Sequence, residues 1–135
     1  MPEKKTRERA RQARREGKSP STQAGEFVRE EIHHIRAGKH GARSAKQAIA
    51  IGLSKARRAG VRLRVPKASS ASAETRAQAK SDLAHAGRRR VSARRSRASA
   101  QALRREGRGA ASSRALARQG RSAARKRRSR RRRGA

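Results

Sequence analysis

Clusters of arginine and lysine are the residues in this chain with the most readily assigned chemistry. A guanidinium group can donate two parallel hydrogen bonds to a phosphate, and a lysine ammonium binds phosphate as a point charge. The clusters recur from position 46 to the end of the chain, where they become nearly continuous. The candidate nucleic-acid-binding residues are Lys46, Lys55, Arg57, Arg58, Arg88, Arg89, Arg90, Arg94, Arg95, Arg104, Arg105, Arg125, Lys126, Arg127, Arg128, Arg130, Arg131, Arg132 and Arg133.

A second group of residues, between positions 30 and 40, has side chains of the types that bind metals. Glu30 lies three residues before His33 and four before His34, which is the spacing of one helix face, and Glu31 and His40 are close in sequence. The sequence has no HExxH pattern, and the nearby positive charge opposes a divalent cation. We therefore expect no bound metal, and we expect these histidines to strengthen anion binding below pH ~6.5.

Catalytic motifs are absent from the sequence. It has no phosphate-binding glycine loop, no serine–histidine–aspartate arrangement and no cysteine. The lack of cysteine also excludes a disulfide scaffold and zinc fingers. We therefore predict that the protein is not an enzyme and has no cofactor.

The charge balance favours a polyanionic partner. The 135 residues include 41 Lys and Arg but nine Asp and Glu, so the net charge is +32. Duplex DNA carries one negative charge per about 1.7 Å, so this charge matches the phosphates of roughly 16 base pairs. Phosphate contacts position a protein without reading bases. We therefore predict a DNA-condensing, nucleoid-associated protein that binds duplex DNA largely without sequence specificity.

RNA or the ribosome is the alternative partner. Many single-strand and RNA modules stack bases on aromatic side chains. The only aromatic residue is Phe27, which we assign to the apolar face of a helix. Arginine-rich RNA binding without stacking stays open. No apolar run is long enough to cross a membrane and no secretory signal is present, so we expect no membrane partner.

The residues most suited to regular structure lie between positions 21 and 66. Helices are predicted over 21–38 and 44–59, from apolar residues at helical spacing. Ser21 or Thr22 can cap the first helix. Ser44 and Gln47 fit a capping box for the second. Small residues on one face of the second helix would let another helix approach closely. Residues 61–65 alternate apolar and basic, which is typical of a short strand or extended segment.

The flanking segments are predicted to be poorly structured. Residues 1–20 form a charged arm with a frayed helix, and residues 67–135 form a basic tail rich in Ala, Arg and Ser. The tail has only four larger apolar residues, too few for a core. We therefore predict a mostly α protein: a small two-helix hairpin module over 21–66, flanked by disordered or marginally helical basic arms.

Two further interpretations of the hairpin stay open. It could be a degenerate helix-turn-helix that reads bases with residues 44–59, but the connection is longer than the usual three or four residues. Its helices over 21–60 could also pair with a second copy of the chain, because the segment is marginally stable alone.

A run of motifs in the hairpin resembles a known family. These are GEFVREE at 25–31, GKHG at 38–41, and RS.KQAIAIGLSKARRAG at 43–60. Together they cover about residues 19–66 and resemble a family of small basic bacterial proteins of unknown function. Some members are labelled DNA-binding or plasmid-stabilisation proteins. The resemblance implies a bacterial, cytoplasmic setting, and it brings no catalytic residues. Together with the predicted DNA binding, this leads us to expect the protein in the bacterial nucleoid.

Overall fold

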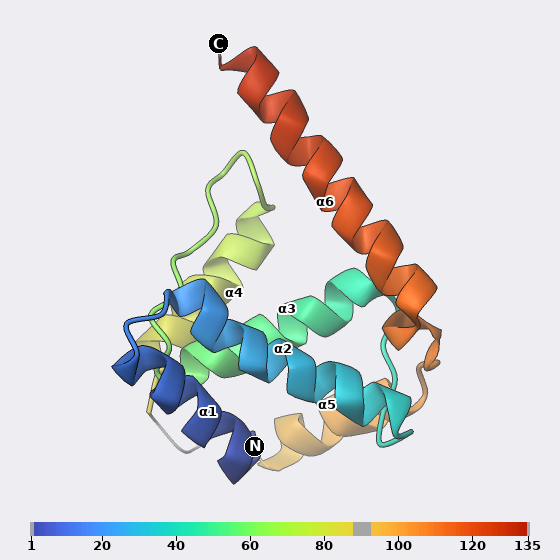
Figure 1. The fold of residues 1–135 in the computed structure, drawn as a ribbon. Helices are drawn as coiled ribbons and strands as arrows, with labels where there is room; N and C mark the ends of the chain where they lie inside the picture. The colour runs from blue at the N-terminus through green and yellow to red at the C-terminus, as the bar shows by residue number, and fades with distance from the viewer. Residues whose placement is uncertain (1, 88–92, 135) are drawn as a thin grey trace.

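The protein is built from helices throughout the part that the structure describes. The computed structural model describes residues 2–87 and 93–134. Within them lie six α-helices and one 3-10 turn, and no strand (Figure 1). The helices are α1 (Lys4–Arg15), α2 (Pro20–Arg36), α3 (Ala45–Arg58), α4 (Ala73–Ala84), α5 (Ala93–Arg104) and α6 (Ser113–Arg133), and the turn is η1 (Gly109–Ala111).

The expected two-helix hairpin with disordered arms is therefore wrong. Helices α2 and α3 match the two predicted helices, but both flanking segments also fold. The physical reason is that alanine makes most of the core. Of the 13 buried hydrophobic residues described, ten are alanine and only Phe27, Ile35 and Val61 are larger. The prediction was based on the number of large apolar residues, so it missed the helix faces that pack through alanine.

The signals at the ends of α2 and α3 are mostly local. Ser44 caps α3 by accepting a hydrogen bond from the Gln47 amide, at 3.2 Å, as predicted. The Gln47 side chain accepts in return from the amide of Arg43, one residue before the cap. Helix α2 begins earlier than predicted, because Ser19 is its cap and Pro20 occupies the first helical position, where the fixed φ of proline suits a helix.

Helices α2 and α3 cross at Gly52, which lies on the face of α3 that was predicted to carry small residues. A Cβ atom at Gly52 would lie 2.6 Å from the Cα of Val28 in α2. The two backbones thus approach more closely than any side chain would permit. This crossing sets the position of everything that packs on either helix.

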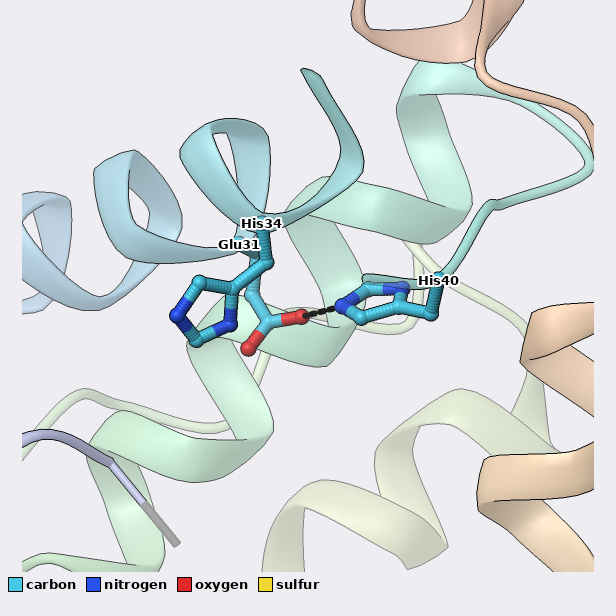
Figure 2. Close-up of side chains that lie close together, drawn as sticks. All are labelled: Glu31, His34 and His40. Carbon is cyan, nitrogen blue, oxygen red and sulfur yellow. Dashed lines mark ion pairs between the residues drawn. The ribbon is translucent and has the colours of Figure 1, made fainter. Parts of the chain in front are cut away.

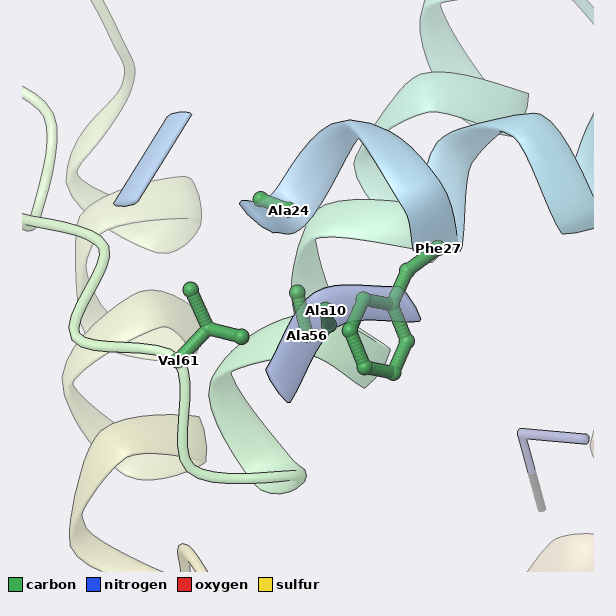
Figure 3. Close-up of a cluster of buried hydrophobic side chains, with 5 residues drawn as sticks. All are labelled: Ala10, Ala24, Phe27, Ala56 and Val61. Carbon is green, nitrogen blue, oxygen red and sulfur yellow. The ribbon is translucent and has the colours of Figure 1, made fainter. Parts of the chain in front are cut away.

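Helix α1 covers one end of this pair. Ala10 of α1 meets Ala24 and Phe27 of α2, and Ala56 and Val61 complete the cluster (Figure 3). Phe27 is 1% exposed, which confirms its predicted place in the core. The N-terminal segment is further held by Glu3, whose carboxylate lies 2.9 Å from Nε2 of His34. This hydrogen bond is the main reason that the pKa of Glu3 is lowered.

Residues 61–65, predicted as a short strand or an extended segment, form no strand, because no other strand is available to pair with them among the described residues. The segment follows α3 without regular secondary structure. Two of its carbonyl groups, those of Leu63 and Arg64, instead accept hydrogen bonds from the guanidinium of Arg57.

The C-terminal half is anchored to the loop between α2 and α3. Ile35, Ala42 and Ala48 form a second buried cluster with Ala110 and Ala111 of η1. The amide of Gly41 donates to the carbonyl of Leu103 at 2.8 Å, and that of Ala42 donates to Gly107 at 3.1 Å. A Cβ atom at Gly41 would collide with the backbone of Glu106, so only glycine fits this approach.

Helix α4 is attached to α3 through one buried carboxylate. Asp82 is 1% exposed and accepts hydrogen bonds from Ser54, Arg58 and Gln78, at 2.7 to 3.0 Å. None of the helices in the described residues combines the length and the apolar character needed to cross a membrane.

Candidate nucleic-acid interface

Helix α6 concentrates positive charge on an exposed rod. Eleven of its 21 residues are Arg or Lys, and none is acidic. At 1.5 Å per residue it is about 31 Å long. Its N-terminal half packs near η1 and α3, and its C-terminal half projects away from the other helices (Figure 1). The basic residues from Arg125 to Arg133 are all exposed.

Five arginines of α6 follow one face of the helix. They occur at intervals of three and four residues, the spacing that places side chains above one another. We call these five residues the arginine stripe: Arg118, Arg121, Arg125, Arg128 and Arg132. The first and last lie 14 residues apart, which is about 21 Å along the axis.

An open groove of about 810 Å³ lies between the N-terminal part of the stripe and the start of α3. Three stripe residues line one side, and Arg43 and Lys46 line the other. Glu106 is the one acidic residue among the lining groups. The N-terminus of α3 opens on the same groove, so the positive end of the helix dipole adds to the side-chain charge.

The groove joins residues that are far apart in the chain. Arg43 and Lys46 belong to the α2–α3 connection and the first turn of α3, whereas the stripe begins more than 70 residues later. The buried alanines of η1 and the hydrogen bonds of Gly41 bring the two together. A phosphate in this groove would meet cations from two directions.

Three of the residues predicted to bind nucleic acid make contacts with other residues of the protein. Lys55 pairs with the buried carboxylate of Glu31. Arg57 is 6% exposed, and burial lowers the pKa of its guanidinium. Arg58 is half-exposed but donates to Asp82 at 2.8 Å. The structure therefore gives these three cations roles in packing, and we leave them out of the interface.

The other predicted residues are placed as follows. Lys46 is exposed at the groove. Arg94, Arg95, Arg104 and Arg105 are exposed on α5 or just after it. The basic residues of α6 are exposed as described, among them Lys126, Arg127, Arg130, Arg131 and Arg133. Arg130 also donates to Ser70 and to the carbonyl of Ser69. The prediction for Arg88, Arg89 and Arg90 lies outside the described residues.

Arg43, Arg118 and Arg121 line the groove, and the sequence-based prediction did not include them. Apart from Lys46 and Lys55, that prediction selected cations in runs, and these three are isolated in the sequence. The three-and-four spacing of the stripe was a usable signal for Arg118 and Arg121. No signal in the sequence pointed to Arg43, because its place depends on the packing of η1.

Acidic and histidine side chains gather at the opposite end of α2 from Pro20. Glu31, His34 and His40 form one group, and Glu3, Glu30 and His34 form another. In each group the potential ligand atoms lie within 4.8 Å of one another. These two groups are the places in the described residues with the side chains to hold a metal ion.

Comparison with known proteins reaches part of the chain. A search of curated proteins and a search of solved structures each find no match. Residues 11–68, from within α1 to the segment after α3, match a family model described as a family of unknown function (DUF6496). This range includes Arg43 and Lys46 but ends well before the arginine stripe, and it supports the resemblance to an uncharacterised family.

Proposed function

We propose that this chain binds the phosphate backbone of duplex DNA without reading its sequence. The observation that carries the proposal is the groove. Its lining includes five cationic side chains, from the α2–α3 connection, the start of α3 and α6, and only one acidic side chain. Arginine binds phosphate oxygens in pairs of hydrogen bonds. Beyond the groove, the arginine stripe continues along α6 for a further turn and a half or more. The phosphates of one strand of a duplex could therefore lie along it.

The low aromatic content supports binding to the phosphate backbone of a duplex rather than to the bases of a single strand. Proteins that bind single strands commonly stack bases on aromatic side chains. Phe27, the sole aromatic residue of the chain, is buried against α1 and α3. No Phe, Tyr or Trp side chain is thus available for stacking, which favours recognition by charge and shape.

Condensation of DNA requires contact with more than one duplex segment. The exposed arginines of α5 supply a second basic surface. Figure 1 shows α5 and the C-terminal end of α6 well apart. We therefore extend the proposal to a protein that bridges and condenses duplexes. Structured RNA is the alternative partner, because phosphate contacts alone discriminate poorly between nucleic acids.

The test is a salt titration of binding to a 30-base-pair duplex, with structured RNA measured in parallel. The diagnostic variant replaces Arg118, Arg121 and Arg125 with glutamine. The matched control replaces three exposed arginines of α1, namely Arg9, Arg11 and Arg14, with glutamine. Both variants lose three positive charges, so they differ in the place of the charge and not in its amount.

The expected result follows from counterion release. Each lost phosphate contact reduces the steepness of log affinity against log salt by about 0.9. The slope of the groove variant should therefore be shallower than that of the wild type by about 2.7. At 0.1 M salt, the same three contacts correspond to a loss of affinity on the order of 100-fold or more. The α1 variant should change the slope by less than about 1.

Equal effects of the two variants would refute the groove as the binding site. No detectable binding of the duplex at 100 mM salt would refute the proposed function as a whole. A preference of at least tenfold for structured RNA at matched salt would replace DNA by the RNA alternative.

A further inference from the structure

Glu31 is a buried carboxylate that the protein satisfies only in part. Its side chain, in α2, is fully buried. Oε1 pairs with the ammonium of Lys55 in α3. Oε2 lies 3.1 Å from Nε2 of His40, yet it receives no hydrogen bond from any described residue. A buried charged oxygen without a hydrogen bond costs free energy, so a ligand at this atom would be stabilising.

The hydrogen bond on the far side of the His40 ring defines what faces Glu31. Nδ1 of His40 lies 3.0 Å from the carbonyl oxygen of Gly41. A carbonyl can only accept, so Nδ1 carries the hydrogen in this contact. In the neutral ring Nε2 then holds a lone pair, and it lies 3.1 Å from Oε2 of Glu31. Two acceptors that face each other need a positively charged group between them.

His34 is oriented in the same manner by a different partner. Its Nε2 lies 2.9 Å from Oε1 of Glu3, and a carboxylate accepts, so Nε2 is the donor. Nδ1 keeps the lone pair of the neutral ring. Figure 2 shows a ring nitrogen of His34 turned towards the carboxylate of Glu31, with His40 on its other side.

From these contacts we propose that Glu31, His34 and His40 bind a divalent transition metal ion, with Zn²⁺ as the best match. Two imidazoles and one carboxylate are a common zinc ligand set, with bonds of about 2.0–2.2 Å. Tetrahedral bonds of that length place neighbouring ligand atoms about 3.3 Å apart, close to the 3.1 Å between Glu31 and His40. The fourth position is left for water.

Each of the three ligands already has an outer partner. Glu3 orients His34, the carbonyl of Gly41 orients His40, and Lys55 holds the second oxygen of Glu31. Outer-shell hydrogen bonds of this kind fix the ring tautomer and the direction of the ligand atoms. The ligands are therefore set in position before an ion arrives. Both rings are partly exposed, which gives an ion a path of entry.

The local charge also differs from the charge of the whole chain. Three carboxylates and two ammonium groups make up the cluster, so its charge is −1. They are Glu3, Glu30 and Glu31 with Lys39 and Lys55. More distant cations are screened over about 8 Å at physiological salt. The sequence-based expectation of no metal relied on the missing HExxH pattern and on positive charge nearby in the sequence, and neither describes the charge of this cluster.

The test is calorimetric titration of Zn²⁺ into the full-length protein, freed of nucleic acid, at pH 7.5 and 150 mM NaCl. The ligand variants are Glu31→Gln, His34→Ala and His40→Ala. His33→Ala is the matched histidine control, because His33 is adjacent in sequence but exposed. Glu74→Gln is the acid control, because Glu74 is exposed in α4 and belongs to neither group of potential ligands. Glu30→Gln separately tests the neighbouring group of Glu3, Glu30 and His34.

We expect one equivalent of Zn²⁺ to bind the wild-type protein. Each ligand variant should bind at least 30-fold more weakly, and each control should change affinity by less than threefold. Failure of the wild-type protein to bind one equivalent would overturn the proposal. Loss of binding in Glu30→Gln with retention in Glu31→Gln would also overturn it.

A measurement on the wild-type protein avoids dependence on how the variants fold. In a long-range ¹H–¹⁵N spectrum of the histidine rings, Zn²⁺ should shift Nδ1 of His34 and Nε2 of His40. The nitrogens of His33 and His85 should not move. Shifts confined to His33 or His85 would refute the assignment. Neither experiment contains DNA, so the result is independent of the proposed function.

Discussion

Substitution of Gly52 by alanine tests the helix crossing on which both sites depend. The added Cβ would lie 2.6 Å from Cα, 2.9 Å from N and 2.9 Å from Cγ2 of Val28. Two of these three atoms are backbone, so a side-chain rotation cannot relieve the collision. Helix α2 must move away from α3, and the groove and the Glu31–Lys55 pair move with these helices.

The size of the effect is the difference of two terms. Alanine favours a helix over glycine by about 1 kcal/mol. Overpacking a close contact costs typically about 1–3 kcal/mol, and a contact with backbone belongs at the upper end of that range. We therefore expect Gly52→Ala to lower the free energy of unfolding by about 2 kcal/mol.

Gly25 provides the matched control, because it is a helical glycine of α2 with nothing within 4 Å of the added Cβ. Gly25→Ala should raise the free energy of unfolding by about 1 kcal/mol through helix propensity alone. The two variants should then differ by about 3 kcal/mol, or roughly 10 °C in melting temperature.

The assay is urea and thermal unfolding followed by circular dichroism, which needs no aromatic reporter. Comparison of the m-values would show whether the unfolding transition itself has changed. If both alanine variants are stabilised by the same amount, α2 and α3 are not in close contact at Gly52. The close packing of α2 on α3 would then be incorrect.

Two further predictions concern the α5 connection and the N-terminal helix. Gly41→Ala should destabilise the protein by about 2 kcal/mol or more, because the added Cβ meets the backbone of Glu106. Gly109→Ala is the control and should be nearly neutral, because the space around its Cβ is open. The same urea assay measures both variants. The hydrogen bond from Gln12, followed by the pair with Lys18, lowers the pKa of Glu16 below its usual value. Since the unfolded chain binds the proton more tightly, this contribution to stability is present above about pH 4.5 and is lost as the pH falls through the folded-state pKa. A carboxyl NMR titration should show that Gln12→Ala raises the pKa of Glu16, and an unchanged value would contradict this cause.

The start of α3 and the C-terminal ends of α2 and α3 could be predicted because their signals are local, whereas the cap of α2 is Ser19 and not the predicted Ser21 or Thr22. A cap needs a few consecutive residues, so Ser44 and Gln47 announce the start of α3 wherever it packs. Gly38 and Gly60 end their helices with a positive φ that glycine tolerates. The net charge and the absence of cysteine are likewise properties of composition, and no fold changes them.

The assembly of the helices was decided by tertiary structure. Alanines are common in this chain, and only the packing determines which of them become core, as Ala48 and Ala111 do. The same packing buries Arg57 and joins Arg43 to the arginine stripe. It also pairs Glu31 with His40 and Lys55. These contacts depend on small, nearly identical faces whose partners lie tens of residues away, and no local spacing encodes which faces meet.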